Sequence, residues 1–206
     1  MDGVFFMKKL LKPVFICFLL VCLVYTIALV GDRQKLRGEL IRLHVVAASD
    51  SEEDQAIKLQ VRDAVLESLQ AGLENATDIE AAKAYIESQL PKLEAAANQV
   101  LAAAGGGDVA TVSLQVEEFA ARVYDTFSLP AGLYDSLRVT IGEGEGRNWW
   151  CVTFPTLCIP ATTEGFEAVA AGAGFSEELT GSLTGEYEVR FYLLDLLGQL
   201  ENFLHR

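Results

Sequence analysis

The first thirty residues contain the longest apolar run of the chain. Lys8, Lys9 and Lys12 precede an uncharged segment, and residues 14–30 are almost all Val, Ile, Leu, Phe, Cys or Ala. A helix of this length spans about 25 Å, slightly less than a hydrocarbon core of about 30 Å. It is also longer than the apolar core of a typical signal peptide. Residues 1–31 are therefore predicted to be a signal peptide or a signal anchor, and the pattern leaves both open.

The remainder, residues 32–206, is predicted to be one extracytoplasmic globular domain that opens with a strand. Within residues 40–47, Ile41, Leu43 and Val45 point one way, while Arg42 and His44 point the other. This alternation is typical of a strand with one buried face.

Two helices are predicted to follow. Ser49, Asp50 and Ser51 are candidate N-caps for a helix that ends near Gln70, because acidic residues come next and apolar residues then recur at helical spacing. Residues 78–104 keep the same spacing up to a run of three glycines. Pro91 lies inside this second stretch and is expected to kink or split it, since proline lacks the backbone N–H.

The middle of the chain has the pattern of β-strands. Apolar and polar residues alternate over residues 112–117, 137–141 and 149–154, with glycine-rich or proline-rich turns at 129–132 and 142–146. Such alternation favours antiparallel strands with one face buried and the other wet or covered by a helix. The predicted fold class is α+β: an N-terminal hydrophobic helix, then a mainly antiparallel sheet packed against two or three helices.

The C-terminal part is less regular. Residues 161–186 are rich in Ala, Gly, Thr, Ser and Glu, and we expect a surface excursion with a short helix near 164–171. Residues 189–204 are expected to begin as a strand and to continue as a helix.

Charge narrows the classes of partner. The net charge is −13, and leaving out residues 1–30, with three Lys and one Asp, leaves 13 basic and 28 acidic residues, or −15. An acidic surface repels phosphate backbones, which argues against nucleic acid as a partner. The short basic N-terminal tail and the acidic body place the body outside the membrane, although Arg33, Lys35 and Arg37 weaken the charge signal.

Little in the sequence predicts catalysis, a cofactor or a metal. His44, with Ser49 and Asp50 nearby, is the basis of an alternative hypothesis, an extracytoplasmic hydrolase that uses His44 and Asp50. Neighbours at a strand end rarely assemble a triad, and capping explains Asp50. Glu143 and Glu145, in the glycine-rich turn, would repel a phosphate and are too few for a calcium site.

Cys151 and Cys158 are separated by six residues. Outside the cytoplasm they would form a disulfide that closes a short loop, worth about 2–3 kcal/mol on the loop-entropy model. The equally weighted alternative is two small buried apolar side chains.

Trp149 and Trp150 must point to opposite faces of a regular strand. One belongs in a core, and the other lies beside arginine on the opposite face, a combination favoured at binding hot spots. The candidate partner-binding residues are Arg147, Asn148 and Trp149, Glu143 and Glu145 of the turn, and Arg42 and His44 on the polar side of the first strand.

Two segments carry a family resemblance. Residues 41–65 read IRLHVVAASDSEEDQAIKLQVRDAV, and residues 130–158 read PAGLYDSLRVTIGEGEGRNWWCVTFPTLC. Together they resemble the stage II sporulation protein R family, which tends to have FPPLC where this chain has FPTLC. The resemblance covers essentially the whole body.

The resemblance implies a signalling protein and not an enzyme. Such proteins are made in the forespore and exported toward the space between the two sporulation membranes. There they activate a membrane-embedded aspartic protease of the mother cell, which processes the pro-form of the first mother-cell sigma factor. The implied partner is this protease, and no cofactor or metal is implied.

Overall fold

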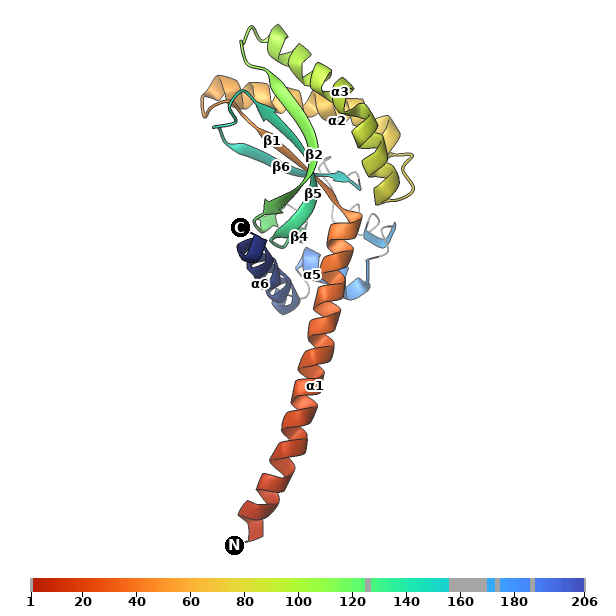
Figure 1. Cartoon of the computed structure of the whole chain (residues 1–206), viewed down its shortest axis with the longest axis vertical. Coiled ribbons are helices and arrows are strands. Elements are labelled where there is room, and N and C mark those ends of the chain that lie inside the picture. Colours follow the sequence, from red (N-terminus) through yellow and green to blue (C-terminus); the bar gives the residue numbers. More distant parts are fainter. Residues whose placement is uncertain (1, 125–126, 156–169, 173–174, 186–187, 206) are drawn as a thin grey trace.

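A computed structural model describes residues 2–124, 127–155, 170–172, 175–185 and 188–205. The chain begins with the long helix α1 (Asp2–Glu39), followed by strand β1 (Ile41–Val46) and helices α2 (Glu52–Leu73) and α3 (Ile79–Ala103). The strands β2 (Ala110–Phe119), β3 (Arg122–Val123), β4 (Ser128–Leu129), β5 (Gly132–Ile141) and β6 (Asn148–Phe154) come next. Helices α5 (Glu177–Thr184) and α6 (Glu188–His205) end the described chain (Figure 1).

The sheet has four strands in the order β2-β5-β1-β6, and β3 and β4 form a separate two-stranded ribbon. β5 is antiparallel to β2, and β6 is antiparallel to β1, whereas β1 and β5 are parallel. The parallel pair needs a long crossover, which α2, α3 and β2 supply. The predicted α+β class with a mainly antiparallel sheet is confirmed.

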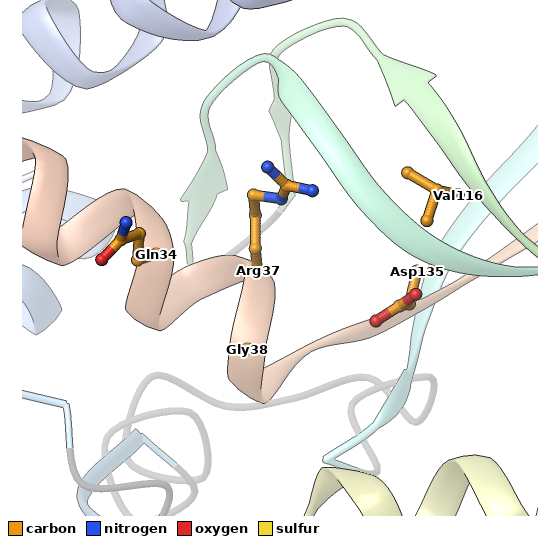
Figure 2. A pocket seen from close by; sticks show the side chains of 5 residues that line it. All are labelled: Gln34, Arg37, Gly38, Val116 and Asp135. Carbon is orange, nitrogen blue, oxygen red and sulfur yellow. The ribbon is translucent and has the colours of Figure 1, made fainter.

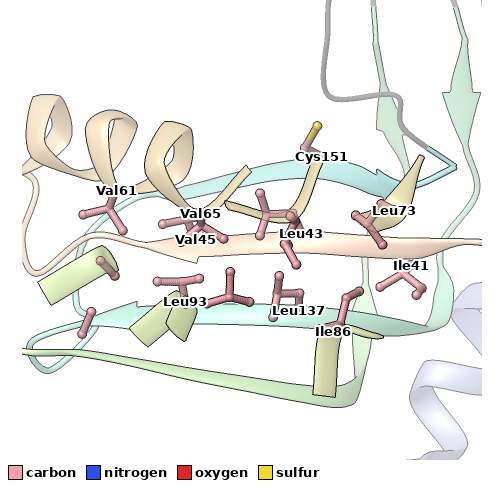
Figure 3. Close-up of a cluster of buried hydrophobic side chains, with 14 of the residues drawn as sticks. Ile41, Leu43, Val45, Val61, Val65, Leu73, Ile86, Leu93, Leu137 and Cys151 are labelled. Atoms are coloured by element: carbon pink, nitrogen blue, oxygen red, sulfur yellow. The ribbon is translucent and has the colours of Figure 1, made fainter. Parts of the chain in front are cut away.

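Helices α2 and α3 cover one face of the sheet and form the first core with it (Figure 3). Ser51 is the N-cap of α2, as predicted, and its side chain accepts from the backbone N–H of Asp54. The central residues of this core include Leu43, Val65 and Leu137, each fully buried. The apolar residues of the alternating strands and those of the regularly spaced helices all point into this core, which is why both patterns could be recognised in the sequence.

Helix α3 is continuous through Pro91, so the expected split is wrong. Ile86 and Leu93, on either side of the proline, are both fully buried in the first core. Their packing on the same sheet holds the two halves in line and compensates for the missing hydrogen bond.

A second core lies on the other face of the sheet. It contains Phe119, Tyr134, Leu129 and Val152 from strands and loops, together with Leu36 from the end of α1. The C-terminal part contributes Ala170, Phe175, Leu179, Leu183 and Leu194.

Two expectations for the C-terminal part are therefore corrected. The described part of 161–186 packs into the second core and is not a surface excursion, since Leu179 and Leu183 are buried one turn apart on α5. Most of the short helix expected at 164–171 falls outside the described residues. Residues 188–205 form a helix throughout, without the expected initial strand.

Helix α1 runs without interruption from the apolar segment into the body. From Leu11 on, the part of α1 before Leu29 is exposed, whereas Leu29 and Leu36 are buried against the second core. Among the described helices, α1 alone is long and apolar enough to cross a membrane, over Leu11–Glu39. The N-terminal apolar helix is thus a candidate signal sequence or anchor.

Candidate partner-binding surface

The glycine-rich turn between β5 and β6 is packed tightly against the loop between β1 and α2. Gly142 and Gly144 have φ values of 56° and 67°, a region that favours glycine. The N–H of Gly146 donates to the carbonyl of Ala47 at 2.9 Å, and a Cβ on Gly146 would lie 2.2 Å from the carbonyl oxygen of Ser49. The turn therefore has a defined position relative to the start of α2.

Arg147 continues this contact. Its backbone N–H donates to Oδ1 of Asp50 at 2.7 Å, and its carbonyl accepts from Nζ of Lys58 at 2.9 Å. Burial and the nearby charge of Arg147 lower the pKa of Lys58. The Arg147 side chain itself is mostly exposed and lies 3.5 Å from Asp50 (Nε to Oδ1). These two hydrogen bonds fix the backbone of Arg147, whereas its guanidinium stays accessible to solvent.

Trp149 follows two residues later and lies on the side of β6 that faces α2. Its ring is 37% exposed, and the guanidinium of Arg62 lies 4.4 Å from the ring centroid. Glu143, Glu145 and Asn148 are exposed as well. The turn and the start of β6 thus expose Glu143, Glu145, Arg147 and Trp149, which we call the hairpin surface, whereas the side chain of Asn148 contacts His44 on the other face of the sheet. Whether the hairpin surface binds a partner stays a prediction.

Arg42 and His44 lie elsewhere, and the expectation of an accessible polar side on the first strand is wrong. Arg42 is fully buried and His44 is 5% exposed. The ring of Trp150 stacks on His44 with a centroid separation of 3.7 Å, and Phe119 lies edge-on to both. The second core covers this side of β1, so neither residue can touch a partner in this conformation.

The buried side chains of His44 and Glu117 form a polar cluster with the more exposed Arg138 and Asn148. Nδ1 of His44 lies 3.2 Å from Oε2 of Glu117, and Nε2 of His44 lies 3.1 Å from Oδ1 of Asn148. Nη1 of Arg138 donates to Oε1 of Glu117 at 2.6 Å. Burial alone would raise the pKa of Glu117, but the hydrogen bonds from His44 and Arg138 and the charge of His44 outweigh it and lower that pKa to about 2. Glu117 therefore stays ionised, and its neighbours in the cluster stabilise the negative charge.

Arg42 sits deeper, among aromatic rings. Its Nη2 donates to the hydroxyl of Tyr124 at 2.8 Å, and its guanidinium lies 4.0 Å from the ring centroid of Phe119. Its Nε and Nη1 have no hydrogen-bond partner among the described residues. Burial lowers the pKa of Arg42, and it raises the pKa of Tyr134 to about 12. Stacking on aromatic rings accounts for this position of a guanidinium.

The geometry gives no support to the hydrolase hypothesis. His44 contacts Glu117, whereas the hydroxyl of Ser49 donates to Oδ2 of Asp54 at 2.5 Å and Asp50 accepts from the backbone of Arg147. A triad requires the nucleophile and the base to share a hydrogen bond, and no such bond joins these residues in the described structure. Within the same described ranges, no group of three or more His, Cys, Asp or Glu is placed to hold a metal ion.

Cys151 lies on β6 and is buried against the first core. Cys158 falls outside the described residues, so the disulfide between the two stays a prediction.

A cleft of about 290 Å³ lies where the end of α1 meets β2 and β5 (Figure 2). Gln34, Arg37, Gly38, Val116 and Asp135 line it. Nζ of Lys83 lies 2.8 Å from Oδ2 of Asp135, and that hydrogen bond raises the pKa of Lys83. The sequence analysis missed this cleft because its residues come from three distant segments, and only the sheet order brings them together.

Comparison with known proteins identifies the family. The family model described as "Stage II sporulation protein R (spore_II_R)" matches residues 37–164, which extend from the end of α1 beyond β6. Stage II sporulation protein R of Bacillus subtilis (strain 168) is 38% identical over 120 residues, which are 58% of this chain and 54% of that protein. The chain thus spans about half the length of this curated relative. No solved structure gives a significant match. The expected resemblance is confirmed, and the chain belongs to the stage II sporulation protein R family.

Proposed function

We propose that this protein is an exported sporulation signal that activates a membrane-embedded aspartic protease of the mother cell. The protease would then process the pro-form of the early mother-cell sigma factor. The observation that carries the proposal is the family match over residues 37–164, which covers both α2 and α3 and all of β1, β2, β5 and β6.

Two features of the molecule support export. A helix long and apolar enough to span a membrane leads directly into the body. The body itself is acidic, with a net charge of −15 over residues 31–206. We place it in the space between the two sporulation membranes, either anchored by α1 or released from it.

The mechanism would be differential binding. A ligand shifts an equilibrium only as far as its affinities for the two states differ, so the signal must bind the active protease assembly more tightly. The hairpin surface is our candidate contact. An exposed aromatic ring against the guanidinium of Arg62, with the exposed Arg147 two residues away in sequence, resembles the centre of many binding hot spots. His44 would position the start of β6 from the other face of the sheet, since it contacts Asn148.

Co-expression in a non-sporulating host tests the function. The chain is produced with the candidate protease and the sigma-factor precursor, and processing is followed by immunoblot. The full-length chain is expected to trigger processing, and a chain without residues 1–30 is expected not to. Absence of processing with a folded full-length chain and an active protease would contradict the proposal.

Trp149→Ala tests the hairpin surface in the same assay. Loss of a hot-spot side chain typically costs more than about 1 kcal/mol, so processing should fall at least about five-fold at limiting signal. The matched control is Val123→Ala, another exposed apolar side chain, which lies on β3 and outside this surface. If Trp149→Ala folds and processes as well as the control, the hairpin surface is the wrong contact while the signalling function still stands.

A further inference from the structure

Helix α6 presents an apolar face to solvent. Five large apolar side chains on that face are more than half exposed, namely Val189, Tyr192, Leu196, Leu200 and Phe203. Their spacing of three or four residues places them on one side of the helix, and we call them the α6 stripe. A surface helix normally turns a charged side outward, whereas α6 buries Leu194 in the second core and is apolar on its outer side as well.

The inward side of α6 combines the buried Leu194 with charged contacts to α1. Arg190 donates to Asp32 at 2.5 and 3.0 Å, and Glu201 pairs with both Arg33 and Arg37 of α1. The carboxylate of Asp195 accepts from the backbone N–H of Ala131 at 2.8 Å.

The inward side of α6 also packs so closely against the backbone of Ala131 that the helix cannot rotate. A Cβ on Gly198 would lie 1.7 Å from the carbonyl oxygen of Ala131. Rotation of α6 would break the charge pairs and drive a side chain into this backbone. The stripe therefore cannot be buried by the body's own packing and needs an outside occupant.

The position of α6 identifies that occupant. Asp32, the partner of Arg190, comes two residues after Val30, the last residue of the apolar run of α1. Arg190 and Glu201 are eleven residues apart, about 16 Å along a helix, yet both reach α1 between Asp32 and Arg37. Helix α6 must therefore cross α1 steeply. It lies at the end of the body from which α1 emerges (Figure 1).

We propose that the α6 stripe lies in the interfacial layer of the membrane that α1 enters. The apolar surface of α1 then continues into an in-plane helix, with Tyr192 and Phe203 at the depth where aromatic side chains are enriched. The stripe has no basic residue and the body is acidic, so the expected ligand is the acyl and glycerol region of a neutral phospholipid. The inference rests on α1 staying in the membrane and is independent of any protease.

Photo-crosslinking of the full-length chain in phosphatidylcholine nanodiscs tests it. Tyr192→p-benzoylphenylalanine and Leu196→p-benzoylphenylalanine place the probe on the stripe at exposed positions, where the core is not disturbed. The control is Val109→p-benzoylphenylalanine, also exposed, in the loop between α3 and β2 at the end of the body opposite α1 (Figure 1). Adducts are identified by mass spectrometry.

Phospholipid adducts are expected at positions 192 and 196 with a yield several-fold above position 109, and neither added anionic lipid nor high salt should change it. Adding Leu196→Asp to the Tyr192 probe should lower the yield. Adducts no more abundant than at position 109 would overturn the proposal. So would crosslinks to a second copy of the chain in place of lipid. Because no protease is present, either failure leaves the proposed signalling function untouched.

Discussion

Glu117 is the residue on which the buried polar cluster of the sheet depends. It accepts from His44 on β1 and from Arg138 on β5, and its own side chain is 9% exposed. Without Glu117, the guanidinium of Arg138 and the ring of His44 would lose the acceptor that they share. Removal of one member of a buried charged cluster is costly because the others lose their compensation.

Glu117→Gln is expected to destabilise the protein at neutral pH and to remove part of its acid sensitivity. The pKa of this carboxyl is about 2 in the folded protein, against 4.5 as its ordinary value. The ionised carboxyl contributes at most about 3 kcal/mol to the free energy of unfolding. This contribution is fully present above pH 4.5 and is lost as the pH falls toward 2.

Urea midpoints in neutral detergent micelles, measured at neutral pH and near pH 3, check this prediction. Glu143→Gln is the control because that carboxyl is exposed in the turn. Equal midpoints for Glu117→Gln and the wild type at neutral pH would rule out the structural role of the cluster.

At the scale of elements, α3 protects the open edge of the sheet. The side chain of Asn98 donates to the carbonyl of Ala110 at 3.0 Å and accepts from its N–H at 2.8 Å. Glu94 accepts from the backbone N–H of Val112 at 3.2 Å. A helix side chain thus replaces the missing neighbouring strand at the start of β2, a common way to shield an edge.

Asn98→Ala should lower the free energy of unfolding by about 1–3 kcal/mol, because it leaves two backbone groups of Ala110 without partners. Asn98→Asp keeps the acceptor and loses the donor, so its free energy of unfolding should fall by less. Glu87→Ala, at an exposed position of the same helix, should stay within about 0.5 kcal/mol of wild type. Denaturant unfolding measures all three variants, and a neutral Asn98→Ala would show that water replaces the side chain.

For the whole molecule, the important connection is the one between α1 and the body. Two buried leucines, Leu29 and Leu36, and the ion pairs with α6 join the end of α1 to the second core. The body is consequently held in a fixed orientation to the apolar helix and does not hang from a flexible linker. A signal that must present one surface to a partner in a facing membrane gains from such an orientation.

Asp32→Asn and Arg190→Gln should each speed amide hydrogen exchange along α6. Both partners are mostly buried, with 14% and 17% of their side chains exposed, so we expect a coupling of about 1–2 kcal/mol. The double variant should exchange little faster than either single one. Lys35→Gln is the control, since Lys35 pairs with Glu39 within α1 itself. Additive effects of Asp32→Asn and Arg190→Gln would mean that the pair does not hold α6.

Local patterns in the sequence determined the elements of the first core. The alternation around Leu43, the helical spacing through Val65 and the N-cap at Ser51 each depend on residues close together in the chain. The exposure of the glycine-rich turn and of Arg147 was also predictable, because it depends on residues close together in the chain. The family resemblance came from the same local segments.

Only the tertiary structure decided what covers the other face of the sheet. Arg42 and His44 have the spacing of exposed polar residues, yet Phe119, Trp150 and the C-terminal part bury them. The cleft at Arg37 and the outward position of the α6 stripe likewise depend on contacts between distant segments. A strand pattern shows that two faces differ, but only the long-range packing determines whether the polar face meets water or a second core.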